Sequence, residues 1–122
     1  FGLAAAGDGG NPNPMDAVRE AAGRPEVFYR RRALAVLGRV DGAGEEKLGF
    51  LLKGLEDTDP AVRRIAAEAL GSIQPEPDVE VKSEVLIETA LAGTLEDSDA
   101  RVRAAAFEGW ITRRERKEKG ET

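Results

Sequence analysis

The fold is decided by a stretch that the chain contains twice, as "LEDTDPAVRRIAAEALGSI" at residues 55–73 and as "LEDSDARVRAAAFEGWITR" at residues 95–113. Asp57, Asp59 and Val62 of the first copy recur 40 positions later in the second copy. Such self-similarity at a fixed spacing is typical of repeat proteins, in which each repeat is one small supersecondary unit. We therefore expect a stack of similar units.

Each copy begins with residues that start a helix. Asp59 offers a carboxylate to the unpaired amides of a first helical turn, and Pro60 suits the first helical position, where no N–H is needed. Asp99 keeps the capping position in the second copy. Apolar residues then follow at the spacing of one helical face, namely Val62, Ile65, Ala66, Ala69, Leu70 and Ile73 in one copy and Val102, Ala105, Ala106, Gly109 and Trp110 in the other.

A weaker third copy lies upstream, in "VFYRRRALAVLGRV" at residues 27–40. Its Arg30 aligns with Arg63, which lies 33 positions later. The difference from the spacing of 40 falls in the connection at residues 74–83, where two prolines prevent a helix and lengthen the loop. Insertions in a repeat array are expected in such loops.

A second amphipathic helix is predicted before each copy. Leucines on one face predict a helix over roughly residues 45–55, and a similar pattern predicts its counterpart over roughly residues 80–95. A weaker version begins at Asn13 and Pro14. The repeated unit is therefore a helix, a short turn and a second helix.

One hairpin of this kind cannot bury its own apolar face, so neighbouring hairpins must stack and share one core. We predict an all-α fold, an α-solenoid of about three helical hairpins. The predicted division is a flexible N-terminal segment at 1–13, a repeat domain at 14–116 with hairpins at about 14–40, 45–73 and 79–113, and a charged C-terminal tail at 117–122.

The pattern "D-x-D-P-x-V-R-x-x-A-x-x-A-L-G", from Asp57 to Gly71, resembles the HEAT repeat. It is similar in particular to the short HEAT-like repeats of phycobilin lyases. The resemblance implies a scaffold or accessory subunit that binds another protein, within a larger complex, through a curved helical surface. A phycobilin-lyase-like role, or another role in handling a small ligand, is the alternative that the resemblance leaves open.

The composition excludes many kinds of active site. The chain has no cysteine and no histidine, which removes thiolate and imidazole metal ligands and the corresponding nucleophiles. Deoxyhypusine hydroxylases share the resembled architecture but use His-Glu pairs for their iron, which this sequence cannot supply. We therefore expect no enzymatic activity, no cofactor and no metal site.

The charge and the hydropathy pattern limit the partners. The chain has 18 basic and 23 acidic residues, and this acidic balance disfavours nucleic acid. No stretch approaches the roughly 20 apolar residues of a membrane-spanning helix. "FGLAAAG" at residues 1–7 is similar to the end of a signal peptide but has no basic region before it, so we expect a cytoplasmic protein.

Arg30, Arg63 and Arg103, the ladder arginines, occupy one aligned position at the border of the apolar stripe. They have two interpretations, a basic row that binds an acidic partner or a set of structural ion pairs. We favour ion pairs because acidic residues recur with the same period as the arginines. The acids available in the turns are Asp57, Asp59, Asp97 and Asp99.

Five other residues are candidates for binding a partner. Arg31 and Arg32 are expected to point outward and to form a small basic patch with Arg64. This patch is either a solvated face, which we favour, or a docking site. Leu34, Phe50 and Phe107 are apolar but lie off the main stripe of their helices. They either pack between repeats or anchor a partner, because large exposed apolar side chains often mark contact sites. Trp110 lies on the stripe, which predicts a core position.

Overall fold

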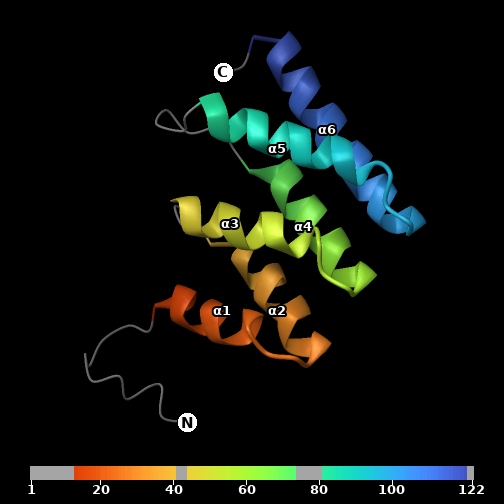
Figure 1. The fold of residues 1–122 in the computed structure, drawn as a ribbon. Coiled ribbons are helices and arrows are strands. Elements are labelled where there is room, and N and C mark those ends of the chain that lie inside the picture. Colours follow the sequence, from red (N-terminus) through yellow and green to blue (C-terminus); the bar gives the residue numbers. More distant parts are fainter. Residues whose placement is uncertain (1–12, 41–43, 74–80, 121–122) are drawn as a thin grey trace.

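The computed structural model describes residues 13–40, 44–73 and 81–120, and this part of the chain forms six helices and no strand (Figure 1). Successive helices pair as three hairpins, which stack along the chain. The prediction of an all-α solenoid of helical hairpins is confirmed. The helices are α1 (Pro14–Ala22), α2 (Val27–Leu37), α3 (Gly44–Gly54), α4 (Pro60–Ser72), α5 (Val81–Thr94) and α6 (Ala100–Glu118).

The helices begin at the residues that the sequence marks. The Asn13 side chain accepts a hydrogen bond from the Met15 N–H at 2.9 Å, and Asp59 accepts one from the Val62 N–H at 2.9 Å. Asp99 does the same for the Arg101 N–H at 2.8 Å. These bonds satisfy first-turn amides that have no partner within the helix. The predicted connection lies mostly outside the described residues, since the structure resumes at residue 81.

The second helices of the hairpins form one tight row. Helix α4 packs against α2 on one side and against α6 on the other, whereas α3 and α5 lie farther apart (Figure 1). The core between the two rows is apolar, and burying each of its leucines contributes about 1.5–3 kcal/mol. Leucines with no exposed surface are Leu37, Leu51, Leu70 and Leu91.

The contact between α4 and α6 is the closest between any two second helices, because glycine meets glycine there. A Cβ atom added to Gly71 would lie 2.6 Å from the Gly109 Cα atom. A Cβ atom added to Gly38, the aligned residue that caps the end of α2, would lie 3.5 Å from the Ala69 Cβ atom, which is ordinary contact. We call the contact between the first two hairpins the first junction and that between the last two the second junction.

The structure describes only part of the two predicted end segments. Of the predicted N-terminal segment 1–13, Asn13 caps α1 and the rest lies outside the described residues. Helix α6 continues to Glu118, so it includes the first two residues of the predicted tail 117–122. Within the described ranges, no helix is both long and apolar enough to cross a membrane.

Candidate protein-binding surfaces

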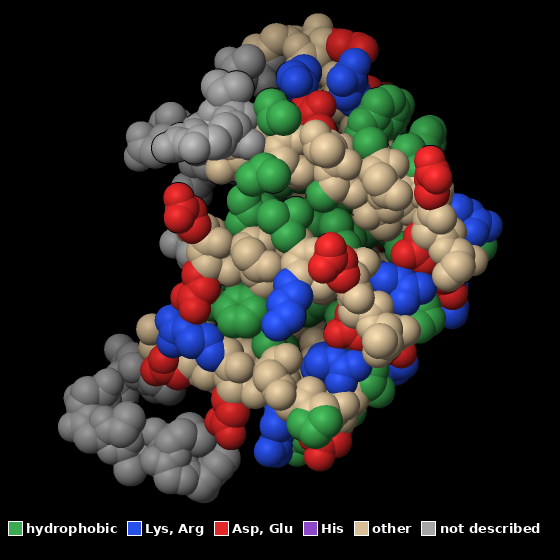
Figure 2. Space-filling view, viewed as in Figure 1, with side chains coloured by type: hydrophobic (Ala, Val, Ile, Leu, Met, Phe, Trp, Pro, Cys, Tyr) green, Lys and Arg blue, Asp and Glu red, His purple; other side chains and the backbone are tan. Residues whose placement is uncertain are grey.

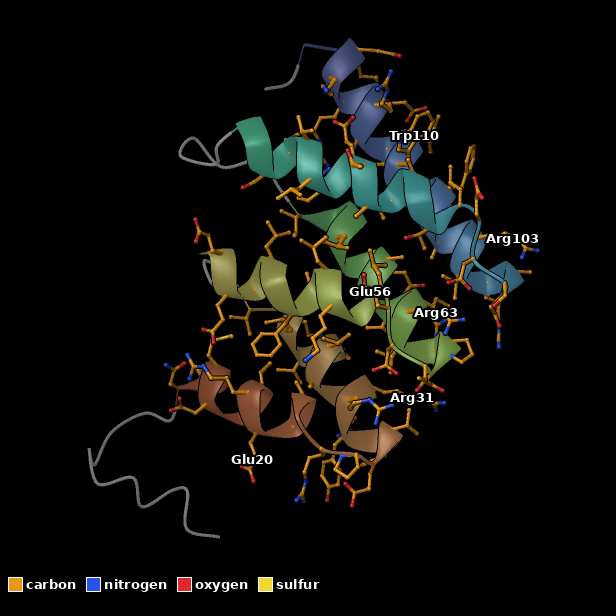
Figure 3. The ribbon with its side chains drawn as sticks, in the orientation of Figure 1. Glu20, Arg31, Glu56, Arg63, Arg103 and Trp110 are labelled. Carbon is orange, nitrogen blue, oxygen red and sulfur yellow. The ribbon has the colours of Figure 1, made fainter. Side chains whose placement is uncertain are left out.

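The ladder arginines join each hairpin to the next. Arg30 donates from Nε and Nη2 to the two carboxylate oxygens of Asp57, at 2.9 and 3.1 Å. Arg63 donates in the same way to Asp97, at 2.8 and 3.0 Å. In both cases the carboxylate belongs to the turn of the following hairpin. Figure 3 shows Arg63 and Arg103 following one another along this edge of the stack.

Each ladder arginine also binds the turn of its own hairpin through Nη1. Arg63 donates to the Asp57 carbonyl at 2.9 Å, and Arg103 donates to the Asp97 carbonyl at 2.8 Å. The two aspartates also bond to the backbone of their own turns. Asp57 and Asp97 each accept the N–H of the residue two positions later, at 2.8 and 2.9 Å. Arg30 and Arg63 therefore form the ion pairs that the structural interpretation predicts. For Arg103 the prediction of an ion pair is wrong within the described residues, because its bond goes to the Asp97 carbonyl and to no carboxylate.

The electrostatics of the ladder follow from these bonds. The hydrogen bonds from Arg30 and Arg63 lower the pKa of the Asp57 and Asp97 carboxyls below their ordinary value. The same bonds raise the pKa of both guanidinium groups. The lowered pKa of each aspartate and the raised pKa of each arginine both favour the charged forms that make the ion pair.

Arg31, a candidate for partner binding, is engaged in the first junction. It donates to both oxygens of Asp59, at 2.9 and 3.0 Å, and this bond lowers the pKa of the Asp59 carboxyl. About half of the Arg31 side chain stays exposed. Arg31 thus extends the ladder by one ion pair instead of presenting a free charge.

The interpretation of Leu34 as a partner anchor is wrong. Its side chain is buried, because α3 covers it at Gly54, which has no side chain to keep Leu34 out. Phe50 is half-buried and packs against the core, which favours packing between repeats. Of the three off-stripe residues, Phe107 remains exposed, over 52% of its surface. Trp110 is partly buried at the edge of the core, with the Arg114 guanidinium 5.3 Å from its ring.

Arg113 is a key residue that the sequence reasoning missed. Its side chain is 1% exposed, and its Nε and Nη2 donate to Glu84 of α5 at 2.7 and 2.6 Å. Its Nη1 donates to carbonyls at the end of α4, at 3.0 Å to Leu70 and 2.7 Å to Ile73. The bonds to Glu84 lower the pKa of its carboxyl, and the bonds to Leu70 and Ile73 give the carbonyls at the end of α4 a charged donor. Arg113 therefore ties α4, α5 and α6 together.

An open groove runs between α4 and α6, on the row of second helices. Its volume is about 630 Å³, and residues without bulk, including Gly71, Ala105 and Gly109, line it together with charged side chains. Arg64, another candidate residue, lines this groove and pairs with Glu68 at 3.0 Å. The remaining charged lining residues are Arg101, Glu108 and Arg116.

The repeat geometry agrees with a comparison against known families. The sequence description of HEAT repeats matches residues 15–109, which is most of the chain. The chain belongs to the HEAT-repeat family. Among curated proteins, none matches it significantly. The HEAT match includes the ladder but ends before Arg113, so the buried arginine is a feature of this chain beyond the matched repeats.

The opposite row of the HEAT stack carries a smaller, mainly apolar hollow. It lies between α3 and α5, has a volume of about 410 Å³, and is lined by Leu52, Leu55 and Ala90 with acidic residues at one end. Figure 2 shows this apolar surface between the two helices. It has no basic lining residue, which distinguishes it from the groove of α4 and α6.

The described part of this HEAT protein holds no cluster of three or more metal-ligating side chains. The closely spaced acids of the turns have other roles. Asp57 and Asp97 bind arginines, and Asp59 and Asp99 cap helices.

Proposed function

We propose that the protein is a non-enzymatic scaffold or accessory subunit, and that it binds a segment of a partner protein in the groove between α4 and α6. The single observation that carries the proposal is that small residues form the bottom of this groove and charged side chains line its edges. Within the family, binding of other proteins by the helical stack is the general role.

The floor of the groove allows close approach. Gly71 and Gly109 bring the two helices together, and Ala105 lies beside them, so no large side chain fills the space. A helix or an extended segment of a partner can therefore lie close to the α4 and α6 backbones. Helix-in-groove binding of this kind uses a shallow channel between two helices.

The rim of the groove supplies charges for orientation. The side chain of Arg101 is 76% exposed, and Arg116 lines the groove about four turns farther along α6. Glu108 lies between them in sequence and adds an acidic position. A partner segment with acidic residues facing the two arginines would be favoured, because complementary charges set orientation and association rate.

The test fills the groove without touching the core. Ala104 is an exposed residue of the groove, and Ala104→Trp would place a large ring over its floor. Ala92 is also exposed but lies on α5 in the other row, so Ala92→Trp is the matched control. Affinity purification from the native source should recover one stoichiometric partner with the wild type and with Ala92→Trp, and not with Ala104→Trp. Equal recovery with all three proteins would contradict the proposal.

A second candidate function, handling a small ligand as a phycobilin lyase does, is favoured by the size of the same groove. Its volume of about 630 Å³ lies within the range of small-molecule pockets, roughly 300–1,000 Å³. Three arginines, Arg64, Arg101 and Arg116, line it. A coloured or other small-molecule adduct on the purified protein, absent from Ala104→Trp, would replace the scaffold proposal with this one.

A further inference from the structure

Three aligned positions on the second helices face the next hairpin in the stack. Leu34 of α2 and Ala67 of α4 are 4% and 0% exposed, because the following hairpin covers each of them. Phe107, the aligned residue of α6, is 52% exposed. Ile111, next on the same face, is also partly exposed, whereas its aligned residue Gly71 is buried. The last helix thus presents the surface that buries a further hairpin elsewhere in the stack.

The arginine on this face is already oriented for a carboxylate. Arg103 donates from Nη1 to the Asp97 carbonyl, as Arg63 does to the Asp57 carbonyl. In Arg63 the other edge of the guanidinium, formed by Nε and Nη2, donates to the aspartate of the next turn. In the described part of the chain, the same edge of Arg103 holds no carboxylate. A guanidinium fixed in this way loses little conformational freedom when it binds.

We propose that this terminal face of α6, formed by Arg103, Phe107, Trp110 and Ile111, docks a helical hairpin of another protein whose turn carries an Asp-x-Asp sequence. The aspartate takes the free edge of Arg103, and the hairpin covers Phe107 as α3 covers Leu34. The terminal face is distinct from the groove, because none of its four residues lines the groove.

A second copy of this chain does not fit the terminal face. In the first hairpin, Arg24 occupies the position that aligns with Asp57, so stacking would place Arg24 against Arg103. Like charges placed together at an interface oppose association. Val36, which is 41% exposed, would also meet Ile111, whereas the second junction places two glycines at this contact. Both the charge and the bulk therefore argue against a second copy as the occupant.

Trp110 is the one tryptophan of the chain, so its fluorescence reports on the terminal face. The probe is a copy of residues 44–73, which holds Asp57 and contains no tryptophan. It is joined to the end of the full chain by a flexible Gly/Ser linker of about 15 residues, long enough to fold back. Acrylamide quenching of Trp110 should be at least halved in the fusion, with emission shifted to shorter wavelength.

Charge changes show whether the aspartate is responsible. Arg103→Asp in the host, or Asp57→Arg in the appended copy, should return Trp110 quenching to the wild-type level, and the two together should restore protection. Arg103 is exposed, so the host variant should fold, and its circular dichroism confirms this. The proposal would be overturned if the appended hairpin left Trp110 quenching unchanged. It would also be overturned if Trp110 stayed protected in both the Arg103→Asp and the Asp57→Arg variants. Protection of Trp110 in the wild type that grows with its own concentration would overturn it too, since a second copy would then be the occupant.

Discussion

The two junctions of the stack share one ladder and differ in what surrounds it. Both contain an arginine bound to the aspartate of the next turn. At the first junction, the carbonyl of Val40 accepts a bond from Lys47, and the Arg19–Glu46 and Arg31–Asp59 pairs each contain an arginine that is about half exposed. At the second, the aligned carbonyl of Ile73 accepts a bond from the buried Arg113. The repeat therefore determines how hairpins align, and residues outside it determine how firmly they hold.

This difference has a clear energetic direction. Ion pairs with an exposed arginine contribute about 0–1 kcal/mol each. The bonds from the buried Arg113 to the carbonyls at the end of α4 cross the second junction, and hydrogen bonds to charged groups contribute about 1.5–3 kcal/mol each. The glycine contact of α4 with α6 adds close packing to the second junction. We therefore expect the hairpin of α1 and α2 to detach from the stack before the others do.

The largest effect is expected at Arg113. Arg113→Ala should lower the free energy of unfolding by about 3–5 kcal/mol. The change leaves Glu84 without its buried partner and removes the donor that the carbonyls at the end of α4 share. Arg114→Ala is the control, since that side chain is 48% exposed, and it should cost under about 1 kcal/mol. Urea unfolding measures both, and equal losses would show that Arg113 has no special role.

The glycine contact offers the next test of the comparison. Gly71→Ala should destabilise by about 1–3 kcal/mol, because its Cβ would force α4 and α6 apart. Gly38→Ala changes the aligned residue of the first junction, where the space is sufficient, and should be neutral or slightly stabilising. Thermal unfolding of the two variants distinguishes the junctions. A loss of similar size at Gly38 would mean that the first junction is packed as tightly as the second.

The ladder should contribute similarly at both junctions. Arg30→Gln and Arg63→Gln should each cost about 1.5–3 kcal/mol, the usual value of hydrogen bonds to charged groups. Arg103→Gln should cost less, because Arg103 makes its bond to a carbonyl and no bond to a following hairpin in the described chain. Chemical unfolding orders the three variants. A loss at Arg103 as large as that at Arg63 would contradict the assigned bonds.

The smallest effect is the pH dependence. The folded pKa values of Asp57, Asp97 and Glu84 lie below their ordinary values, 3.8 for the aspartates and 4.5 for the glutamate. The stability from these pairs is therefore complete above about pH 5 and is lost as the pH falls through the lowered values. The urea midpoint should stay level near neutral pH and fall in acid. Asp57→Asn combined with Asp97→Asn should be less stable at neutral pH and less sensitive to acid.

The repeated sequence was sufficient to predict the helices, their caps and the alternation of the hairpins. It predicted the ladder because the arginines and aspartates share one period. It could not place Leu34, because helical periodicity shows which face is apolar but not which neighbour covers it. Arg113 was missed because it lies in the charged sequence "TRRERKEKGET" at residues 112–122, although it aligns with Ile73 of the apolar stripe.

The buried Arg113 also determines where the molecule can bend. The ladder holds both junctions at the turn end of the hairpins, and Arg113 adds a bond near the opposite end of α4 and α6. The last two hairpins should therefore move as one rigid block, while the first swings about the Arg30–Asp57 edge. A pulling force on the stack should separate α2 from α4 first. The groove between α4 and α6, and a partner bound in it, should change little.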